Sequence, residues 1–160
     1  MLFRILSLIV LFFILTNYSY SAATSTGDTE SNYDKAAKLI KTAKKYESKG
    51  KDKKAKKRYE RALKFLVKAN KEKPNQADTL NYLGFATRKL GDYKKGEKYY
   101  LLGLEIDPNH KGINEYLGEL YVVTNRIDLA KQRLDVLKNC NCEEYNELKE
   151  IIEGKKQSKY

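Results

Sequence analysis

From Tyr33 onward, apolar residues return every three or four positions, and no stretch alternates apolar with polar residues. A spacing of three to four residues places apolar side chains on one face of an α-helix, whereas a half-buried strand needs alternation. Polar breaks interrupt the pattern near Gly50, Gly91 and Asn125. The pattern therefore predicts an all-α domain of consecutive helices. Residues 24–32 are small and polar, and we expect them to form a disordered leader.

The chain also repeats itself with a period of thirty-four residues. Leu83-Gly84 and Leu117-Gly118 lie one period apart. In the unit 77–110 the matching positions are Leu80, Leu83, Gly84, Thr87, Gly96, Tyr100 and Gly103, and in the unit 111–142 they are Asn114, Leu117, Gly118, Tyr121, Ala130, Leu134 and Leu137. A repeat of this length is typical of stacked helical hairpins. Small residues are expected where two helices approach closely.

Residues 36–74 fit the same template with one insertion. Pro74 arrives seven residues later than the terminal proline of the repeat would. Seven residues make two helical turns, about 10 Å at 1.5 Å per residue, and two whole turns keep the same face toward the core. We therefore expect one long second helix from Asp52 to about Lys71.

A short amphipathic helix is predicted over residues 143–153. Its apolar residues share one side, and Glu143 and Glu144 lie in the first turn, where the helix dipole favours acids. The last hairpin of a helical stack exposes an apolar face, which this helix would cover as a cap. Residues 154–160 are expected to form a flexible tail.

The skeleton of residues 36–153 resembles the tetratricopeptide repeat (TPR), in which Leu-Gly, aromatic, Ala and Pro positions recur at fixed spacings. The resemblance implies an all-α fold, a right-handed superhelical stack of three hairpins over residues 36–74, 77–110 and 111–142, closed by the capping helix 143–153. Thr87 stands in place of a tyrosine and Gly96 in place of an alanine, so we expect a looser contact between helices there.

The resemblance also implies a function, because the first helices of successive TPR hairpins line a concave groove that binds another protein. Alignment with the repeat places nine residues in this groove: Lys41, Lys44, Asn81, Phe85, Arg88, Lys89, Glu115, Glu119 and Val122. An amide such as Asn81 can bind a peptide backbone, and Arg88 and Lys89 can meet a carboxylate. A groove that runs from cationic to anionic would select the orientation of its ligand. For each residue alone, the alternative is an ordinary solvated side chain.

The first 23 residues have the form of a secretory signal peptide. Arg4 precedes a nearly unbroken apolar run from Ile5 to Leu15, and small residues at Ser21 and Ala23 suit cleavage after position 23. The apolar run is shorter than the about 20 residues that a membrane span needs. We therefore expect an exported protein in the periplasm of a Gram-negative bacterium. The alternative is a chain tethered to the membrane by an uncleaved N-terminal segment.

Positive charge is concentrated in one part of the chain. Residues 35–73 carry 17 Lys or Arg and four acids, whereas residues 74–160 carry 14 of each sign. The candidate basic patch comprises Lys53, Lys54, Lys56, Lys57, Arg58, Arg61, Lys64 and Lys68. Such a face would bind a polyanion in a salt-dependent way. Export argues against nucleic acid and leaves an anionic envelope polymer, a membrane surface or an acidic protein face. The alternative is a solvated helix face.

Cys140 and Cys142 are the two cysteines of the chain, and they fall at the exit turn of the unit 111–142. An oxidising compartment would allow a disulfide between them, which requires non-helical backbone at Asn141. A redox role is a further hypothesis. A structural zinc site is the weaker alternative, because two thiolates fall short of four ligands and His110 is the sole histidine.

The sequence offers no set of residues that suggests catalysis. It lacks a Ser-His-Asp or Cys-His arrangement, a Gly-rich phosphate loop and acids at the spacing of a metal site. We therefore predict a non-enzymatic adaptor of the cell envelope without cofactor or metal. The alternative function is polyanion or membrane-surface binding through residues 35–73. A homodimer through the exposed first helix is a further alternative.

Overall fold

The computed structural model describes residues 30–158 of the chain. The predicted signal peptide, residues 1–23, and most of the predicted leader lie outside the described residues. The described region forms seven helices: α1 (Asn32–Glu47), α2 (Asp52–Glu72), α3 (Ala77–Lys89), α4 (Tyr93–Ile106), α5 (Lys111–Val123), α6 (Ile127–Leu137) and α7 (Glu143–Ile152). Residues 30–158 contain no strand, so the predicted all-α class is confirmed for this region.

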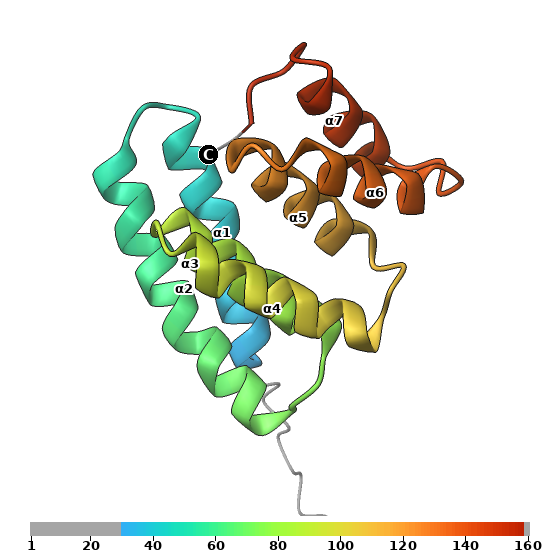
Figure 1. Cartoon of the computed structure of the whole chain (residues 1–160). Coiled ribbons are helices and arrows are strands. Elements are labelled where there is room, and N and C mark those ends of the chain that lie inside the picture. The colour runs from blue at the N-terminus through green and yellow to red at the C-terminus, as the bar shows by residue number, and fades with distance from the viewer. Residues whose placement is uncertain (1–29, 159–160) are drawn as a thin grey trace, which may run out of the picture.

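The helices pair into three hairpins that stack in chain order. Helix α1 packs on α2, α3 on α4, and α5 on α6, and the next hairpin adds its first helix to the previous pair (Figure 1). Helix α7 packs on α5 and α6, as expected of a cap. The first helices of the hairpins, α1, α3 and α5, also contact one another in order. We call the surface that these three helices form the groove face.

Short polar motifs set the helix ends. The side chains of Ser31 and Asp92 accept hydrogen bonds from backbone N–H groups at the starts of α1 and α4, which satisfies donors that the helix itself leaves open. The turns inside the three hairpins need left-handed backbone, with φ of 63° at Gly50, 97° at Gly91 and 58° at Asn125. Glycine and asparagine adopt this region at little cost, so the predicted breaks are the turns.

Helix α2 is the longest helix, as the insertion predicted. It has 21 residues, whereas α4 has 14 and α6 has 11. The extra turns keep Leu66 and Ala69 buried, so the apolar face continues without rotation. At the C-terminal end of α2, Glu72 accepts a hydrogen bond of 2.6 Å from the side chain of Asn32 on α1. The first hairpin is therefore longer than the two that follow.

Glycines allow the helices to approach closely. A Cβ on Gly84 would lie 2.5 Å from Cε1 of Tyr100, and one on Gly118 would lie 2.5 Å from Cδ2 of Leu148 in the cap. At Gly96 a Cβ would lie 3.1 Å from Cβ of Arg88. The looser contact expected at Gly96 is therefore wrong, because the missing side chain lets α3 and α4 come together. Thr87, where the same was expected, is buried.

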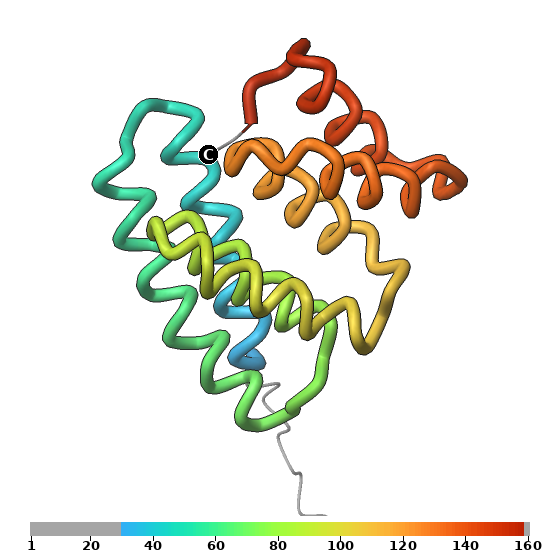
Figure 2. Tube along the Cα trace, in the orientation of Figure 1, coloured from blue at the N-terminus to red at the C-terminus, as the bar shows by residue number. Residues whose placement is uncertain are grey.

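The chain that follows α7 turns back toward α5 (Figure 2). Lys156 forms an ion pair with Glu147 of α7, and the hydroxyl of Ser158 donates to Oε2 of Glu119 on α5 at 3.4 Å. The structure thus places residues 154–158, the first part of the predicted flexible tail, against the domain. Within residues 30–158, no helix combines the length and the apolar character that crossing a membrane requires.

Candidate functional site

The centre of the groove face is a buried arginine. Arg88 of α3 has a fully buried side chain, and so has Glu119 of α5, whose Oε2 lies 3.3 Å from the guanidinium. Arg88 also donates to the backbone carbonyl of Tyr116 at 3.1 Å. Removal from water lowers the pKa of Arg88, and the nearby carboxylate of Glu119 opposes that shift. This ion pair therefore joins the second hairpin to the third.

Aromatic rings enclose the same guanidinium. The ring centroids of Tyr116 and Phe85 lie 5.1 and 5.2 Å from Cζ of Arg88, and that of Tyr100 lies at 6.0 Å. These distances suit cation–π attraction, which is stronger where water is excluded. Burial raises the pKa of the Tyr100 and Tyr116 hydroxyls, so both stay protonated. The aromatic residues fix Arg88 rather than present it to solvent.

A second cation crosses the groove face from α1. Nζ of Lys44 donates to the hydroxyl of Tyr116 on α5 at 2.9 Å, and it lies 4.6 Å from the ring centroid of Phe85 on α3. One side chain therefore contacts the first helices of all three hairpins. The contact therefore links α1 to α5 across the groove face.

The third cation of the groove face is also paired. Nζ of Lys89 lies 2.8 Å from Oε1 of Glu47, and the other oxygen of Glu47 accepts a 2.8 Å hydrogen bond from the Tyr59 hydroxyl. Burial, and secondarily this hydrogen bond, raises the pKa of Tyr59. Lys44, Arg88 and Lys89 thus all make contacts within the domain.

The nine residues that the resemblance placed in the groove divide into three groups. The structure brings Lys44, Phe85, Arg88 and Glu119 into the central cluster, with Lys89 beside it. Asn81 and Glu115 line a hollow farther along the groove face. Lys41 is exposed, and Val122 is half-buried against the apolar cluster that includes Leu117 and Leu120. Neither therefore joins the others. Their role in binding a partner remains a prediction.

The hollow lies between α3, α5 and α7 and has a volume of about 550 Å³. We call it the acidic hollow, because its lining includes Asp78, Asp107, Glu115 and Glu144, together with Asn81, Tyr82, Asn109, His110, Lys111, Gly112 and Tyr116. Asn81 is 7% exposed, and its Oδ1 accepts no hydrogen bond from any residue that the structure describes. Four carboxylates and the side chain of Asn81 therefore line the space.

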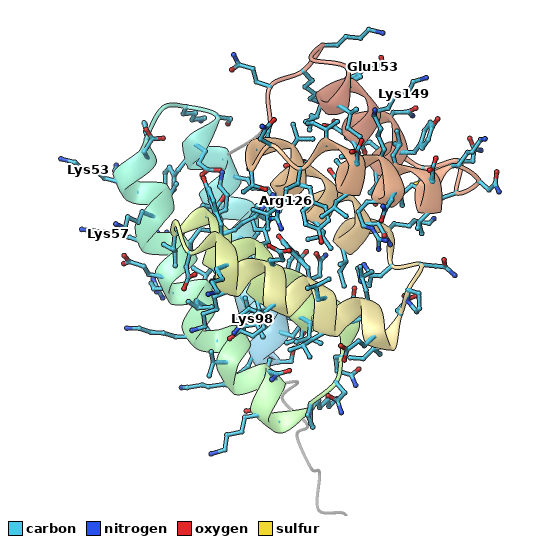
Figure 3. The ribbon with its side chains drawn as sticks, in the orientation of Figure 1. Lys53, Lys57, Lys98, Arg126, Lys149 and Glu153 are labelled. Carbon is cyan, nitrogen blue, oxygen red and sulfur yellow. A yellow bond between two sulfur atoms is a disulfide. The ribbon has the colours of Figure 1, made fainter. Side chains whose placement is uncertain are left out.

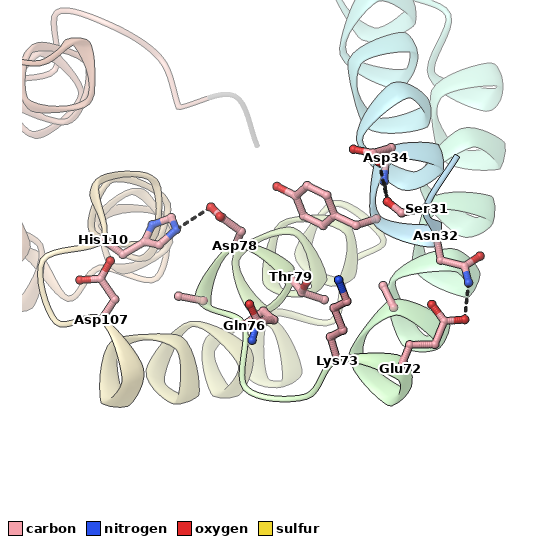
Figure 4. A pocket seen from close by; sticks show the side chains of 13 residues that line it. Ser31, Asn32, Asp34, Glu72, Lys73, Gln76, Asp78, Thr79, Asp107 and His110 are labelled. Carbon is pink, nitrogen blue, oxygen red and sulfur yellow. Dashed lines mark hydrogen bonds and ion pairs between the residues drawn. The ribbon is translucent and has the colours of Figure 1, made fainter. Parts of the chain in front are cut away.

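A second hollow of about 380 Å³ adjoins it near the N-terminal ends of α1 and α3, and the two share Asp78, Asp107 and His110 (Figure 4). Nε2 of His110 lies 3.1 Å from Oδ1 of Asp78, while its Nδ1 accepts from the backbone N–H of Ile113. Asp34 and Glu72 of this second hollow accept hydrogen bonds from Ser31 and Asn32. This end of the molecule is therefore acidic over two neighbouring spaces.

The predicted basic patch lies on α2, away from the groove face. Lys53 and Lys57 extend from this helix into solvent (Figure 3). All eight residues of the patch are exposed except Arg58, which is half-buried. Tyr46, Lys54, Lys57, Arg58 and Arg61 line a hollow of about 460 Å³. Within the described part of the chain, none of the eight forms an ion pair with a carboxylate.

Cys140 and Cys142 are joined by a disulfide in the structure. Asn141 between them has a φ of 46°, which is the non-helical backbone that so short a loop needs. The bridge precedes α7 and holds the exit of the third hairpin. A redox role remains a prediction. Among residues 30–158, no group of three or more His, Cys, Asp and Glu side chains is arranged to hold a metal ion.

Several residues that contribute to the groove face were not identified from the sequence. Tyr116 contacts both Lys44 and Arg88, and Glu47 holds Lys89, but the TPR pattern assigns neither a role. Asp78 of α3 and Glu144 of α7 lie far apart in the sequence, and only the folded chain brings them to one hollow. The available signal for Tyr116 was Tyr82, the same aromatic residue one period of thirty-four residues earlier.

Comparisons with known proteins support the architecture. No protein-family model and no curated protein sequence matches the chain. The first TPR domain of human RPAP3 is 21% identical, with 79% of this chain and 98% of that chain covered and a TM-score of 0.55. The first TPR of Spaghetti (RPAP3), bound to the HSP90 peptide SRMEEVD, is 20% identical over 79% of this chain and 97% of that chain, with a TM-score of 0.53. The chain therefore has the TPR fold, as its repeat predicted.

Proposed function

We propose that this chain, which has the TPR fold, is a non-enzymatic adaptor that binds a segment of another protein on its groove face. The observation that carries the proposal is the acidic hollow of about 550 Å³, which opens between α3, α5 and α7 and is lined by polar side chains. A similar fold, the first TPR of Spaghetti (RPAP3), is bound to a peptide of HSP90. That binding supports the same use of the fold here.

The structure changes which residues can test this proposal. Arg88 and Lys89 are held by Glu119 and Glu47, so replacing them would disturb the domain as well as its surface. Lys41 on α1 and Lys111 on α5 are exposed and can carry a photo-crosslinking side chain with little effect on folding. Lys131 on α6 is an exposed control away from the groove face.

Irradiation of the protein in its own cell envelope should yield a protein adduct from positions 41 and 111 and little adduct from position 131. The reason is that a partner seated on the groove face lies near the first two positions. Gel analysis with mass spectrometry measures the adducts. Equal yields from all three positions would contradict the proposal, because they would show collision rather than a seated partner.

The cell envelope enters the proposal through the signal-like residues 1–23, where Arg4 precedes an apolar run. Cleavage after Ala23 would release the protein into the periplasm. Mass spectrometry of the protein recovered from the periplasmic fraction should show a chain that begins at Thr24. Recovery of the full-length chain in the membrane fraction would favour the uncleaved anchor instead.

A second candidate function is supported by the hollow on α2. Lys54, Lys57, Arg58 and Arg61 surround one space, and α2 has nine Lys or Arg against three acids. A polyanion that reaches several of these groups would release counterions, so its binding would weaken steeply with salt. Co-sedimentation with vesicles of anionic phospholipid at 50 and 300 mM salt tests this. Binding that is absent or insensitive to salt would remove the candidate.

A further inference from the structure

We propose that the acidic hollow binds a cationic side chain, the ammonium or guanidinium group of a lysine or arginine in the partner segment. The inference rests on the proposed function and names the chemistry of the partner. It differs from the expectation that Arg88 and Lys89 meet a carboxylate of the ligand.

The acidic hollow carries an excess of negative charge. Asp78, Asp107, Glu115 and Glu144 line the hollow, against Lys111 and the single histidine His110, which already contacts Asp78. These carboxylates come from α3, the turn before α5, α5 itself and α7, so the fold gathers them from distant parts of the sequence. Like charges in one space raise its attraction for a cation.

The amide of Asn81 supports a hydrogen-bond donor as ligand, independently of the acids. Its side chain is more than nine-tenths buried and lines the hollow, and its Oδ1 accepts no hydrogen bond from the described residues. This oxygen is closed to solvent, so the amide must rotate before a ligand donor can reach it. The bond would then recover the free energy that a buried acceptor without a donor costs. Room for this amide comes from Gly112, because a Cβ there would lie 2.8 Å from Nδ2 of Asn81.

The donor inventory then identifies the ligand group. Carboxylates and an amide oxygen accept hydrogen bonds, whereas a lysine ammonium offers three donors and an arginine guanidinium five, with no acceptor on either. A cationic side chain can therefore donate hydrogen bonds to Asn81 and to the acids together. The apolar stem of lysine or arginine can lie along Tyr82 and Tyr116, which also line the hollow.

The opposite choice, an acidic ligand, fits less well. The three cations that it would need, Lys44, Arg88 and Lys89, already contact Tyr116, Glu119 and Glu47. An incoming carboxylate would have to replace these contacts and approach the acids of the hollow. Discrimination against the wrong charge is a usual source of specificity in such interfaces.

A pair of matched peptides tests the inference. The probes are acetyl-Gly-Ser-Lys-Ser-Gly-amide and the same peptide with acetylated lysine, which keeps the stem and removes the charge. Each is titrated into the ¹⁵N-labelled chain without residues 1–23, which retains the whole described domain. The lysine peptide should shift the backbone amide signals of Asn81, Gly112 and Glu115 in a saturable way. The acetylated peptide should bind at least tenfold more weakly, and equal shifts by both peptides would overturn the inference.

Variants place the binding at the hollow. The combined change Glu115→Gln and Glu144→Gln should weaken the lysine peptide at least tenfold, while Glu105→Gln on the exposed side of α4 should leave it unchanged. If the first pair does not fold, Asp78→Asn with Asp107→Asn provides a second test, because both side chains are exposed. Unchanged binding in a folded variant pair would overturn the proposal.

The inference and the proposed function can fail separately. Photo-crosslinking from positions 41 and 111 that persists in the Glu115→Gln and Glu144→Gln variant would show a groove partner that needs no cation, and the inference alone would be wrong. Lysine-peptide binding at Asn81 without any groove-specific adduct in the cell envelope would support the cation site and contradict the adaptor function.

Discussion

The cations of the groove face and those of α2 are the same residue types in opposite situations. Lys44, Arg88 and Lys89 contact carboxylates, hydroxyls and rings inside the domain. The basic patch of α2 is exposed, and its eight members form no ion pair with the carboxylates of residues 30–158. The groove cations hold the hairpins together, whereas the α2 cations are available to an external partner.

Burial is the physical reason for the difference. A guanidinium or ammonium removed from water must regain its solvation from protein groups, and Arg88 does so through Glu119, a backbone carbonyl and three rings. An exposed lysine on α2 keeps its water and needs no partner.

The largest effect is expected for Arg88→Met. The change leaves the carboxylate of Glu119 buried without its cation, which should lower the free energy of unfolding by about 3–5 kcal/mol. Urea denaturation followed by circular dichroism measures the loss. The matched control is Arg61→Met on α2, which is exposed and should change stability by less than about 0.5 kcal/mol. Similar losses of stability in the two variants would show that burial does not distinguish Arg88 from the cations of α2.

An intermediate effect of each buried tyrosine is expected at alkaline pH. Burial raises the pKa of Tyr59, Tyr100 and Tyr116 above the ordinary value of about 10. Above about pH 10 these hydroxyls lose protons in the unfolded chain and keep them in the folded one, so rising pH favours unfolding. Each group should contribute a loss of about 1.4 kcal/mol per pH unit from there upward and nothing below.

Denaturation midpoints at pH 9, 10 and 11 test this dependence. Tyr100→Phe removes one contributing group and should make the loss above pH 10 shallower by that group's share. A stability that is unchanged between pH 9 and 11 would show that the rings around Arg88 are not as enclosed as the structure indicates.

The smallest effect on stability is expected on the outer side of α2. Replacing Lys57 and Arg61 together by glutamine should leave the free energy of unfolding within about 0.5 kcal/mol of its original value, because both are exposed. The same variant should elute from a resin that carries phosphate or sulfate groups at a lower salt concentration, because two contacts with those groups are lost. A large loss of stability would mean that the α2 cations are structural too.

The fold could be predicted largely from the sequence. The thirty-four-residue period located the hairpins, and the late Pro74 located the long α2, because both depend on local helix periodicity. The candidate site was less accessible. Alignment with the repeat placed Asn81 and Glu115 in the groove, but it could not show that both line one hollow or that Arg88 is buried against Glu119.

Local patterns in the sequence locate the helices, the turns between them and the concentration of positive charge. Packing of the three hairpins on one another decides which cations are enclosed and which stay exposed. Lys44 and Tyr116 are 72 positions apart, and Arg88 and Glu119 are 31 apart. Such contacts depend on the curvature of the whole stack, which no local pattern encodes, and they separate structural cations from available ones.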